Sequence, residues 1–147
     1  MEQATADPAL RPKPQLTFDT LWWYDALRSH QLLIQRCTEC GTLRHPVQPM
    51  CASCHCLSWD TVEASGQATV HSFVIAHHPK IPGFDYPLAI GLLDLAEGTR
   101  LLANIVGCAV EHVHIGMAVS MEFIDIDEER SFPQFRPVPA GEGTVSS

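Results

Sequence analysis

The chain has 147 residues, 46% apolar and 18% charged, a balance typical of a globular protein rather than a disordered one. Nine basic residues stand against 17 acidic ones, and this net charge of −8 disfavours nucleic acid as a partner, because phosphate neutralisation needs a basic surface. No apolar run approaches the ~20 residues of a membrane span, and residues 1–8 lack the basic start and apolar core of an export signal, so we expect a cytoplasmic protein without a membrane partner.

The first third of the chain predicts little regular structure apart from one helical stretch. Residues 1–16 contain three prolines among small and polar residues and are expected to form a flexible leader. Apolar residues then recur at helical spacing from Phe18 to Leu33, which predicts a helical segment within residues 17–35. Its aromatic residues either pack on the rest of the chain or form a docking surface for another protein. They are Trp22, Trp23 and Tyr24.

From Val62 onward the pattern is that of β-strands. Over residues 66–77, the even-numbered positions from Ala68 to Ala76 are expected to share one face of a strand. The remaining expected elements, in chain order, are a loop over 78–87, strands over 88–95 and 99–106 joined by a tight turn, a helical turn over 109–116, a strand over 118–127, an edge strand over 132–138 and a disordered tail over 139–147.

Five of the six cysteines lie between residues 36 and 60, and four of them form two Cys-x-x-Cys pairs separated by ten residues. Two such knuckles place four thiolates around a Zn²⁺ ion. The predicted ligands are Cys37, Cys40, Cys51 and Cys54. Because four thiolates leave no open coordination position, we expect one structural zinc ion per chain, which contributes on the order of 10 kcal/mol of folding free energy.

Alternatives to this ligand set remain. The segment from Cys51 to His55 matches the Cys-x-x-Cys-His haem attachment pattern, although that chemistry usually follows export. A thioredoxin-like redox pair would require a strand before it and a helix after it. Cys56 can replace Cys54 as a ligand, although the shorter knuckle is the commoner geometry. Cys108 lies alone in the second half and is expected to be a small buried apolar residue.

No catalytic residue is assigned, because neither a local Ser-His-Asp arrangement nor a glycine-rich phosphate loop is present in the sequence. The loop after the first long strand is a candidate ligand groove. His77 and His78 enter a Pro/Gly segment that also contains Phe84 and Tyr86. The alternative is that both histidines are simply solvated.

The order of the motifs resembles one family over roughly Phe18 to Pro137. After the paired aromatics, the motifs are Gln35-Arg36-Cys37-x-x-Cys40-Gly41, Cys51-x-x-Cys54, Trp59, Gly66-x-x-x-Val70-x-Ser72-Phe73, Leu93-Asp94-Leu95-x-x-Gly98, Ile115-Gly116-Met117-x-Val119 and Phe132-Pro133-x-Phe135. The chain resembles the zinc-ribbon/OB-fold family known as domain of unknown function 35, which is associated with acyl-CoA metabolism. This resemblance implies a mainly β fold: an N-terminal helix or helical hairpin, a rubredoxin-like zinc ribbon over 36–61 and a small OB-fold barrel over 62–138.

The resemblance also implies a function. Members accompany thiolase-fold enzymes, so we expect a non-catalytic accessory subunit of a lipid-transfer-type aldolase, thiolase or acyltransferase that acts on acyl-CoA thioesters in steroid side-chain or fatty-acid metabolism. The aromatic helix and the ribbon would dock to the partner. Coenzyme A phosphates require cations, and the obvious candidates near the ribbon and barrel are only Arg44, Lys80 and Arg100, so we expect the partner to supply much of any coenzyme A pocket. The alternatives are a standalone acyl-CoA or lipid-binding module and a nucleic-acid-binding ribbon/OB protein.

Two positions depart from the family pattern. His55 stands where members commonly have glycine after the second cysteine pair, and Ser29-His30 stand in place of a usual glycine. We therefore expect an altered second knuckle and a different end to the first helix, with no loss of a predicted ligand.

Overall fold

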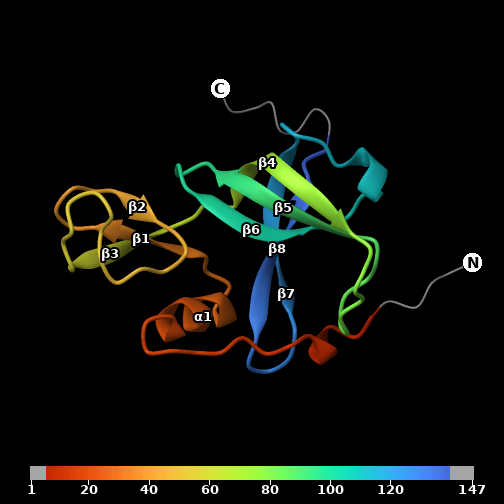
Figure 1. Cartoon of the computed structure of the whole chain (residues 1–147), viewed down its shortest axis with the longest axis horizontal. Coiled ribbons are helices and arrows are strands. Elements are labelled where there is room, and N and C mark those ends of the chain that lie inside the picture. Colours follow the sequence, from red (N-terminus) through yellow and green to blue (C-terminus); the bar gives the residue numbers. More distant parts are fainter. Residues whose placement is uncertain (1–5, 140–147) are drawn as a thin grey trace, which may run out of the picture.

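The computed structural model describes residues 6–139. A three-stranded ribbon sheet of order β2-β1-β3 stands beside a closed five-stranded barrel of order β4-β5-β6-β8-β7, and α1 lies between the ribbon and the end of the barrel (Figure 1). The elements in chain order are η1 (Pro8–Leu10), α1 (Leu21–Arg28), β1 (Leu33–Cys37), β2 (Leu43–Arg44), β3 (Trp59–Glu63), β4 (Gln67–Ala76), β5 (Leu88–Leu95), β6 (Arg100–Ile105), η2 (Val110–His112), β7 (Ala118–Asp125) and β8 (Ser131–Pro137).

The expected fold class is confirmed: the protein is mainly β, with a ribbon that carries four cysteines and a closed barrel. The helical hairpin is not formed, because the described residues contain one α-helix and two short 3₁₀-helices. In that part of the chain, no helix has the length and apolarity to cross a bilayer. Leu27, Leu32 and Ile34 are fully buried in the same apolar cluster as the inner residues of the barrel, so α1, the ribbon and the barrel share one core.

The helix is shorter than the apolar spacing predicts. It ends at Arg28 because His30 adopts a left-handed conformation with φ of +59°, while the backbone N–H of Gln31 donates to the carbonyl of Ala26 at 2.9 Å. The His30 ring stacks on Phe123 and its Nε2 lies 2.7 Å from an Asp125 carboxylate oxygen. These two contacts link the end of α1 to β7. His30 therefore has two roles: its backbone takes the conformation usual for glycine, and its side chain anchors the helix.

A β-bulge breaks the regular alternation expected in β4. The pairing of β4 with β5 shifts between Val70 and Ser72. Val70 faces the core before the shift, as expected, but Phe73 and Ile75 pack against the core after it, and Val74 is 60% exposed. The expectation that even-numbered positions share one face is therefore wrong beyond the bulge, because one extra residue moves every following side chain to the opposite face.

The last strand closes the barrel and is not the edge strand that we expected. β8 pairs along its length with β7 and pairs in parallel with β6, where Phe135 of β8 lies opposite Ile105 of β6. The side chain of Phe135 is completely buried. Arg136 and Gln134 of β8 donate hydrogen bonds to the carboxylate of Glu122 on β7. The hydrogen bond from Arg136, followed by that from Gln134, holds the pKa of Glu122 below its ordinary value against a partial desolvation penalty.

Residues 6–12 of the expected flexible leader are hydrogen-bonded along the barrel. Arg11 Nε donates to the carbonyl of Gly83 at 2.9 Å, and the Arg11 guanidinium lies 4.2 Å from the centre of the Phe84 ring. Arg130 in turn donates to the carbonyl of Arg11 at 3.0 Å. Residues 6–12 are thus linked to the barrel, whereas residues 1–5 and nearly all of the expected tail, 140–147, lie outside the described residues.

Candidate metal centre and surface hollows

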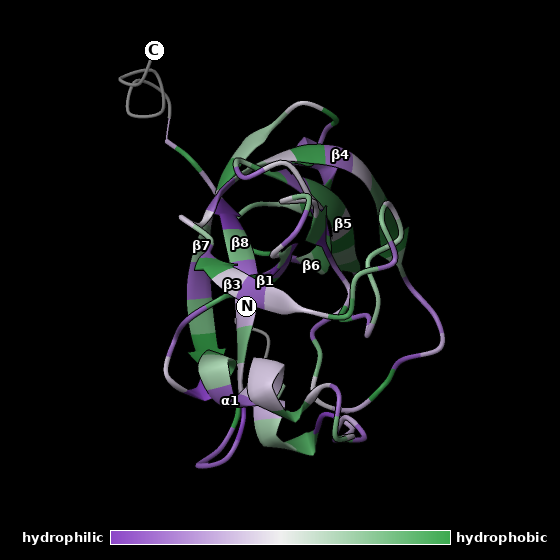
Figure 2. Ribbon diagram, turned by 90° about the vertical axis from the view of Figure 1, so that its left-hand side faces the viewer, coloured by the Kyte–Doolittle hydropathy of each residue, from purple (hydrophilic) through white to green (hydrophobic). Residues whose placement is uncertain are grey.

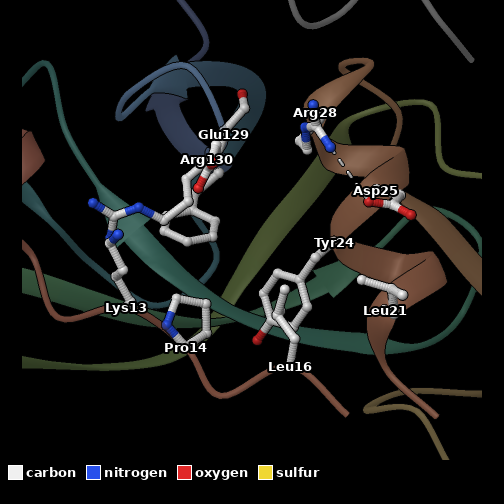
Figure 3. Close-up of a pocket in the computed structure, with 11 residues that line it drawn as sticks. Lys13, Pro14, Leu16, Leu21, Tyr24, Asp25, Arg28, Glu129 and Arg130 are labelled. Atoms are coloured by element: carbon white, nitrogen blue, oxygen red, sulfur yellow. Dashed lines mark ion pairs between the residues drawn. The ribbon is translucent and has the colours of Figure 1, made fainter. Parts of the chain in front are cut away.

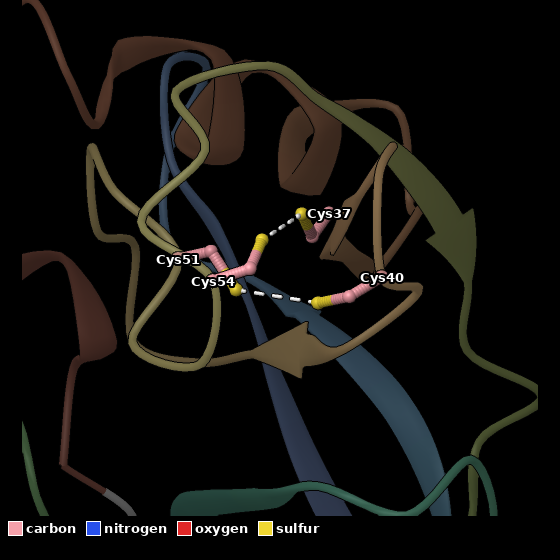
Figure 4. A group of neighbouring side chains, drawn as sticks. All are labelled: Cys37, Cys40, Cys51 and Cys54. Atoms are coloured by element: carbon pink, nitrogen blue, oxygen red, sulfur yellow. Dashed lines mark hydrogen bonds between the residues drawn. The ribbon is translucent and has the colours of Figure 1, made fainter.

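The four predicted ligands meet at one point in the ribbon. Their Sγ atoms all lie within 4.8 Å of one another, and the shortest approaches run between the two knuckles, 3.5 Å from Cys37 to Cys54 and 3.6 Å from Cys40 to Cys51 (Figure 4). A tetrahedral zinc site with Zn–S bonds of ~2.3 Å has S–S edges of about 3.8 Å. The cluster is therefore already close to the size that a zinc ion requires.

The two knuckles have the same backbone geometry. The N–H of Gly41 donates to the carbonyl of Cys37 at 2.9 Å, and the N–H of His55 donates to that of Cys51 at 2.9 Å. Gly41 has φ of +76° and His55 has φ of +66°. The second knuckle is thus not altered in its backbone: His55 adopts the left-handed conformation that glycine would take, at a steric cost that glycine avoids.

The electrostatics of the cluster call for a cation. The backbone N–H of Cys40 lowers the pKa of Cys37, and the backbone N–H of Cys54 lowers the pKa of Cys51. The N–H of Cys56 acts to lower the pKa of Cys54, but the neighbouring sulfurs outweigh it and raise that pKa to about 12. Four thiolates this close therefore repel one another unless a divalent ion neutralises them, which is the chemistry of a structural zinc site.

The alternatives to zinc fit the structure less well. Cys56 stays outside the group of four, and its sulfur accepts a hydrogen bond from the N–H of Ser58 at 3.3 Å. No helix follows either cysteine pair before β3, as a thioredoxin-like site would require. Cys51 and Cys54 belong to the four-sulfur cluster and are not free for a haem group. The donor set of four cysteines on two knuckles fits zinc.

The three aromatic residues of α1 pack on their own chain. Trp22 lies against Trp59 with ring centres 4.8 Å apart, Trp23 against His45 at 5.4 Å, and Tyr24 against Phe132 at 6.3 Å. All three side chains are only partly exposed. Internal packing, one of the two interpretations of the sequence, is therefore present, and docking by these residues stays a prediction.

The candidate groove residues separate into distinct places. His78, Phe84 and Tyr86 line one hollow of 380 Å³ on the outside of the barrel, and Lys80 lies in an adjoining one of 390 Å³. His77 lies outside both. The other two basic candidates are engaged elsewhere: Arg44 is buried in the ribbon, where its Nε donates to the carbonyl of Gln48, and Arg100 donates to Asp94 at 2.7 Å. The predicted groove thus reduces to the loop that carries the two aromatic residues.

Sequence reasoning missed a further hollow of 290 Å³ between the leader, α1 and the turn before β8 (Figure 3). Leu16, Leu21 and Tyr24 form its apolar side, and Lys13 and Arg28 lie at its rim. No local sequence pattern predicts this hollow, because it forms only where the leader lies against α1 and the turn before β8. A leader that is expected to be flexible gives no reason to predict a hollow that the leader itself helps to line.

Together, α1, the four-cysteine ribbon and the closed barrel define a class of protein, the zinc-ribbon/OB-fold proteins. Two family models match in this order: the "ChsH2, rubredoxin-like zinc ribbon domain" over residues 25–58 and the "ChsH2, C-terminal OB-fold domain" over residues 61–123. A chain of the solved "Ltp2-ChsH2(DUF35) aldolase" superposes with a TM-score of 0.81 at 44% identity, covering 85% of this chain and 98% of that chain. The chain belongs to the DUF35 family.

Curated relatives include subunits of larger enzymes. The chain is 46% identical over 137 residues to a "Probable enoyl-CoA hydratase alpha subunit" of Thermomonospora curvata, covering 92% of this chain and 43% of the relative. It is 38% identical over 122 residues to the "3-oxo-4,17-pregnadiene-20-carboxyl-CoA hydratase alpha subunit" of Mycobacterium tuberculosis, covering 83% and 39%. The chain thus spans about two-fifths of the length of these relatives.

Proposed function

We propose that this chain is a non-catalytic accessory subunit of a cytoplasmic complex that acts on acyl-CoA thioesters, and that its partner is a thiolase-fold enzyme that carries the catalytic residues. The observation that supports this most strongly is the match to nearly the whole DUF35 chain of the "Ltp2-ChsH2(DUF35) aldolase". The two curated relatives are named as alpha subunits of hydratases, and each name includes a coenzyme A ester. In the second name, the acyl group of that ester is a steroid acid. We therefore place the acyl group among steroid side-chain or fatty-acyl thioesters.

The proposed role of the zinc ion is structural. Cys37, Cys40, Cys51 and Cys54 would hold it, and it would fix the shape of a ribbon whose tip contains few buried apolar residues. Thiolate ligands persist in a reducing compartment, which is consistent with the cytoplasm. The ribbon surface is a candidate docking face because Leu57 is 70% exposed, Met50 46% and Trp59 36%. Trp59 also continues this surface to Trp22 of α1.

Affinity purification of the tagged chain from its own cells, followed by mass spectrometry, tests the proposal. We expect one thiolase-fold protein in near-stoichiometric amount. The isolated chain alone, or a stoichiometric partner of another class, would overturn the proposal.

The docking face is tested with Leu57→Asp, which places a charge on the ribbon, and with Ile115→Asp as the matched control. Both side chains are about equally exposed, 70% and 68%, so neither substitution should unfold the chain. We expect the first to lower co-purification at least tenfold and the second to leave it unchanged. Equal recovery would remove the ribbon from the interface.

A further inference from the structure

Strand β5 is apolar on both of its faces from Leu88 to Leu93, and Asp94 is the one charged residue on its outer face. Its side chains alternate between fully buried positions, such as Leu93, and half-buried positions on the outside of the barrel: Leu88, Ile90 and Leu92. Figure 2 shows β5 coloured as hydrophobic. The outer face of an antiparallel sheet that meets water is normally polar, and a strand that is apolar on both faces is normally covered on both.

The neighbouring strands extend this outer apolar surface. Ile90 pairs with Val74 of β4, and Leu92 pairs with Leu102 of β6. Val74 is 60% exposed and Leu102 is 67% exposed. The β-bulge in β4 turns Val74 to this side, so the surface spans three strands.

A loop borders one end of this surface and forms a wall of an open hollow. The segment between β4 and β5 brings Ile81, Phe84 and Tyr86 beside Ile90 and Leu102, and together they line an open hollow of 380 Å³. None of its lining residues carries a carboxylate, an ammonium or a guanidinium group. The Tyr86 hydroxyl already accepts a hydrogen bond from the N–H of Ile81 at 3.0 Å, so this polar group is engaged within the protein. The hollow is thus suited to an apolar occupant of a size usual for ligand sites.

A second open hollow of 420 Å³ adjoins the first, since Phe84 and Leu102 line both, and we call the two together the joined hollows. Arg11 and Lys13 of the leader lie at this second hollow. Burial lowers the pKa of Arg11, while the charges of Asp85 and Arg130 act on it in opposite directions. Lys13 is exposed and forms no ion pair with the described residues. The joined hollows therefore have an uncharged apolar end and an end with two cations.

We propose that the joined hollows bind a linear aliphatic anion. Its hydrocarbon chain lies between the loop and the outer face of β5 and β6, and its anionic end lies at Lys13 and Arg11. This site belongs to the chain itself and goes beyond the proposed function, because it needs no partner.

Calorimetric titration of the full chain with dodecanoate, decanoate and octanoate tests the site. We expect one dodecanoate per chain, and an affinity that falls about fourfold for each methylene removed, because each buried methylene contributes about 0.8 kcal/mol. Leu102→Asp should weaken binding at least tenfold. Ile115→Asp, with 68% exposure against 67% for Leu102, should leave it unchanged.

The anionic end is tested separately. Lys13→Gln should weaken dodecanoate binding severalfold and leave the binding of dodecanol unchanged, because the alcohol carries no charge. An equal effect on both ligands would overturn the assignment of the charged end. Absence of saturable binding, lack of dependence on chain length, or equal effects of the two aspartate substitutions would overturn the whole inference.

The outcome is distinguishable from that of the proposed function. If the chain recovers its thiolase-fold partner but does not bind dodecanoate, this inference alone fails. If Leu102→Asp then also abolishes recovery of the partner, the apolar face is a protein interface and not a lipid site. Dodecanoate binding by a chain that recovers no partner would overturn only the proposed function.

Discussion

Replacing Cys54 by serine removes one of the four zinc ligands, and replacing Cys56 by serine removes a thiol only two residues away. The structure places Cys54 Sγ 3.5 Å from Cys37 Sγ and leaves Cys56 outside the cluster. A structural zinc ion contributes on the order of 10 kcal/mol of folding free energy, so one ligand in four accounts for about 3 kcal/mol. Cys54→Ser should therefore weaken zinc retention about a hundredfold.

The same arithmetic gives a different result for Cys56. Its sulfur accepts one hydrogen bond from the N–H of Ser58, and a serine hydroxyl can accept the same bond. We expect Cys56→Ser to keep one zinc ion per chain and to change the free energy of unfolding by less than about 0.5 kcal/mol.

The assay is the zinc content of each purified variant after gel filtration against a competing chelator, with urea unfolding measured in parallel. Loss of zinc from Cys56→Ser with retention in Cys54→Ser would show that the ligand set is wrong. Full retention in both variants would show that the cysteine cluster does not hold the metal, and a wild-type chain without zinc would refute the metal centre itself.

Three further predictions concern stability. Phe135→Ala should lower the free energy of unfolding, measured by urea titration, by about 3–5 kcal/mol because this ring is completely buried where the barrel closes. Phe18 is 97% exposed, so Phe18→Ala should change the same free energy by less than about 0.5 kcal/mol. Equal costs would contradict the closed barrel. His55→Gly should raise the free energy of unfolding by up to about 1 kcal/mol with unchanged zinc content, because it relieves the left-handed backbone; a loss of stability would show that the histidine ring makes an essential contact. Glu122→Gln should cost less than about 1 kcal/mol at neutral pH. Because the pKa of Glu122 is lowered in the folded state, the full cost of Glu122→Gln is present above the ordinary pKa of about 4.3 and shrinks as the pH falls through the folded pKa. A difference in unfolding free energy between wild type and variant that grows on acidification would contradict the ion pair.

Local patterns predicted the parts of the protein that depend on local spacing. The two Cys-x-x-Cys pairs fold as knuckles whose sulfurs meet, and the strands after Val62 lie close to their expected positions because apolar alternation reports which side chains face a core. The helix, in contrast, was expected to continue toward Leu33. A left-handed residue at His30 ends it, and this conformation is uncommon for any residue other than glycine.

Features that depend on distant residues could not be predicted in the same way. The bulge after Val70 reverses the faces of β4, and the run of apolar residues from Phe73 to Ala76 does not locate it, because a shift of register is a property of two strands. The pairing of β8 with β6 likewise depends on Phe135 meeting Ile105. The candidate groove failed to assemble for the same reason, since Arg44 belongs to the ribbon and Arg100 is already paired with Asp94.

The strand order of the barrel has a consequence for the order of events during synthesis. The three strands of the ribbon have all emerged once Glu63 has left the ribosome, so the four cysteines can capture their metal early. The barrel cannot close at that stage, because β4 pairs with β7 and β6 pairs with β8, and β7 and β8 are synthesised last. Domains fold from the N-terminus as synthesis proceeds, and distant pairings form slowly. α1 and the metal-bearing ribbon are thus made before the barrel, and Leu27, Leu32 and Ile34 complete the shared core only when the last strands have been added.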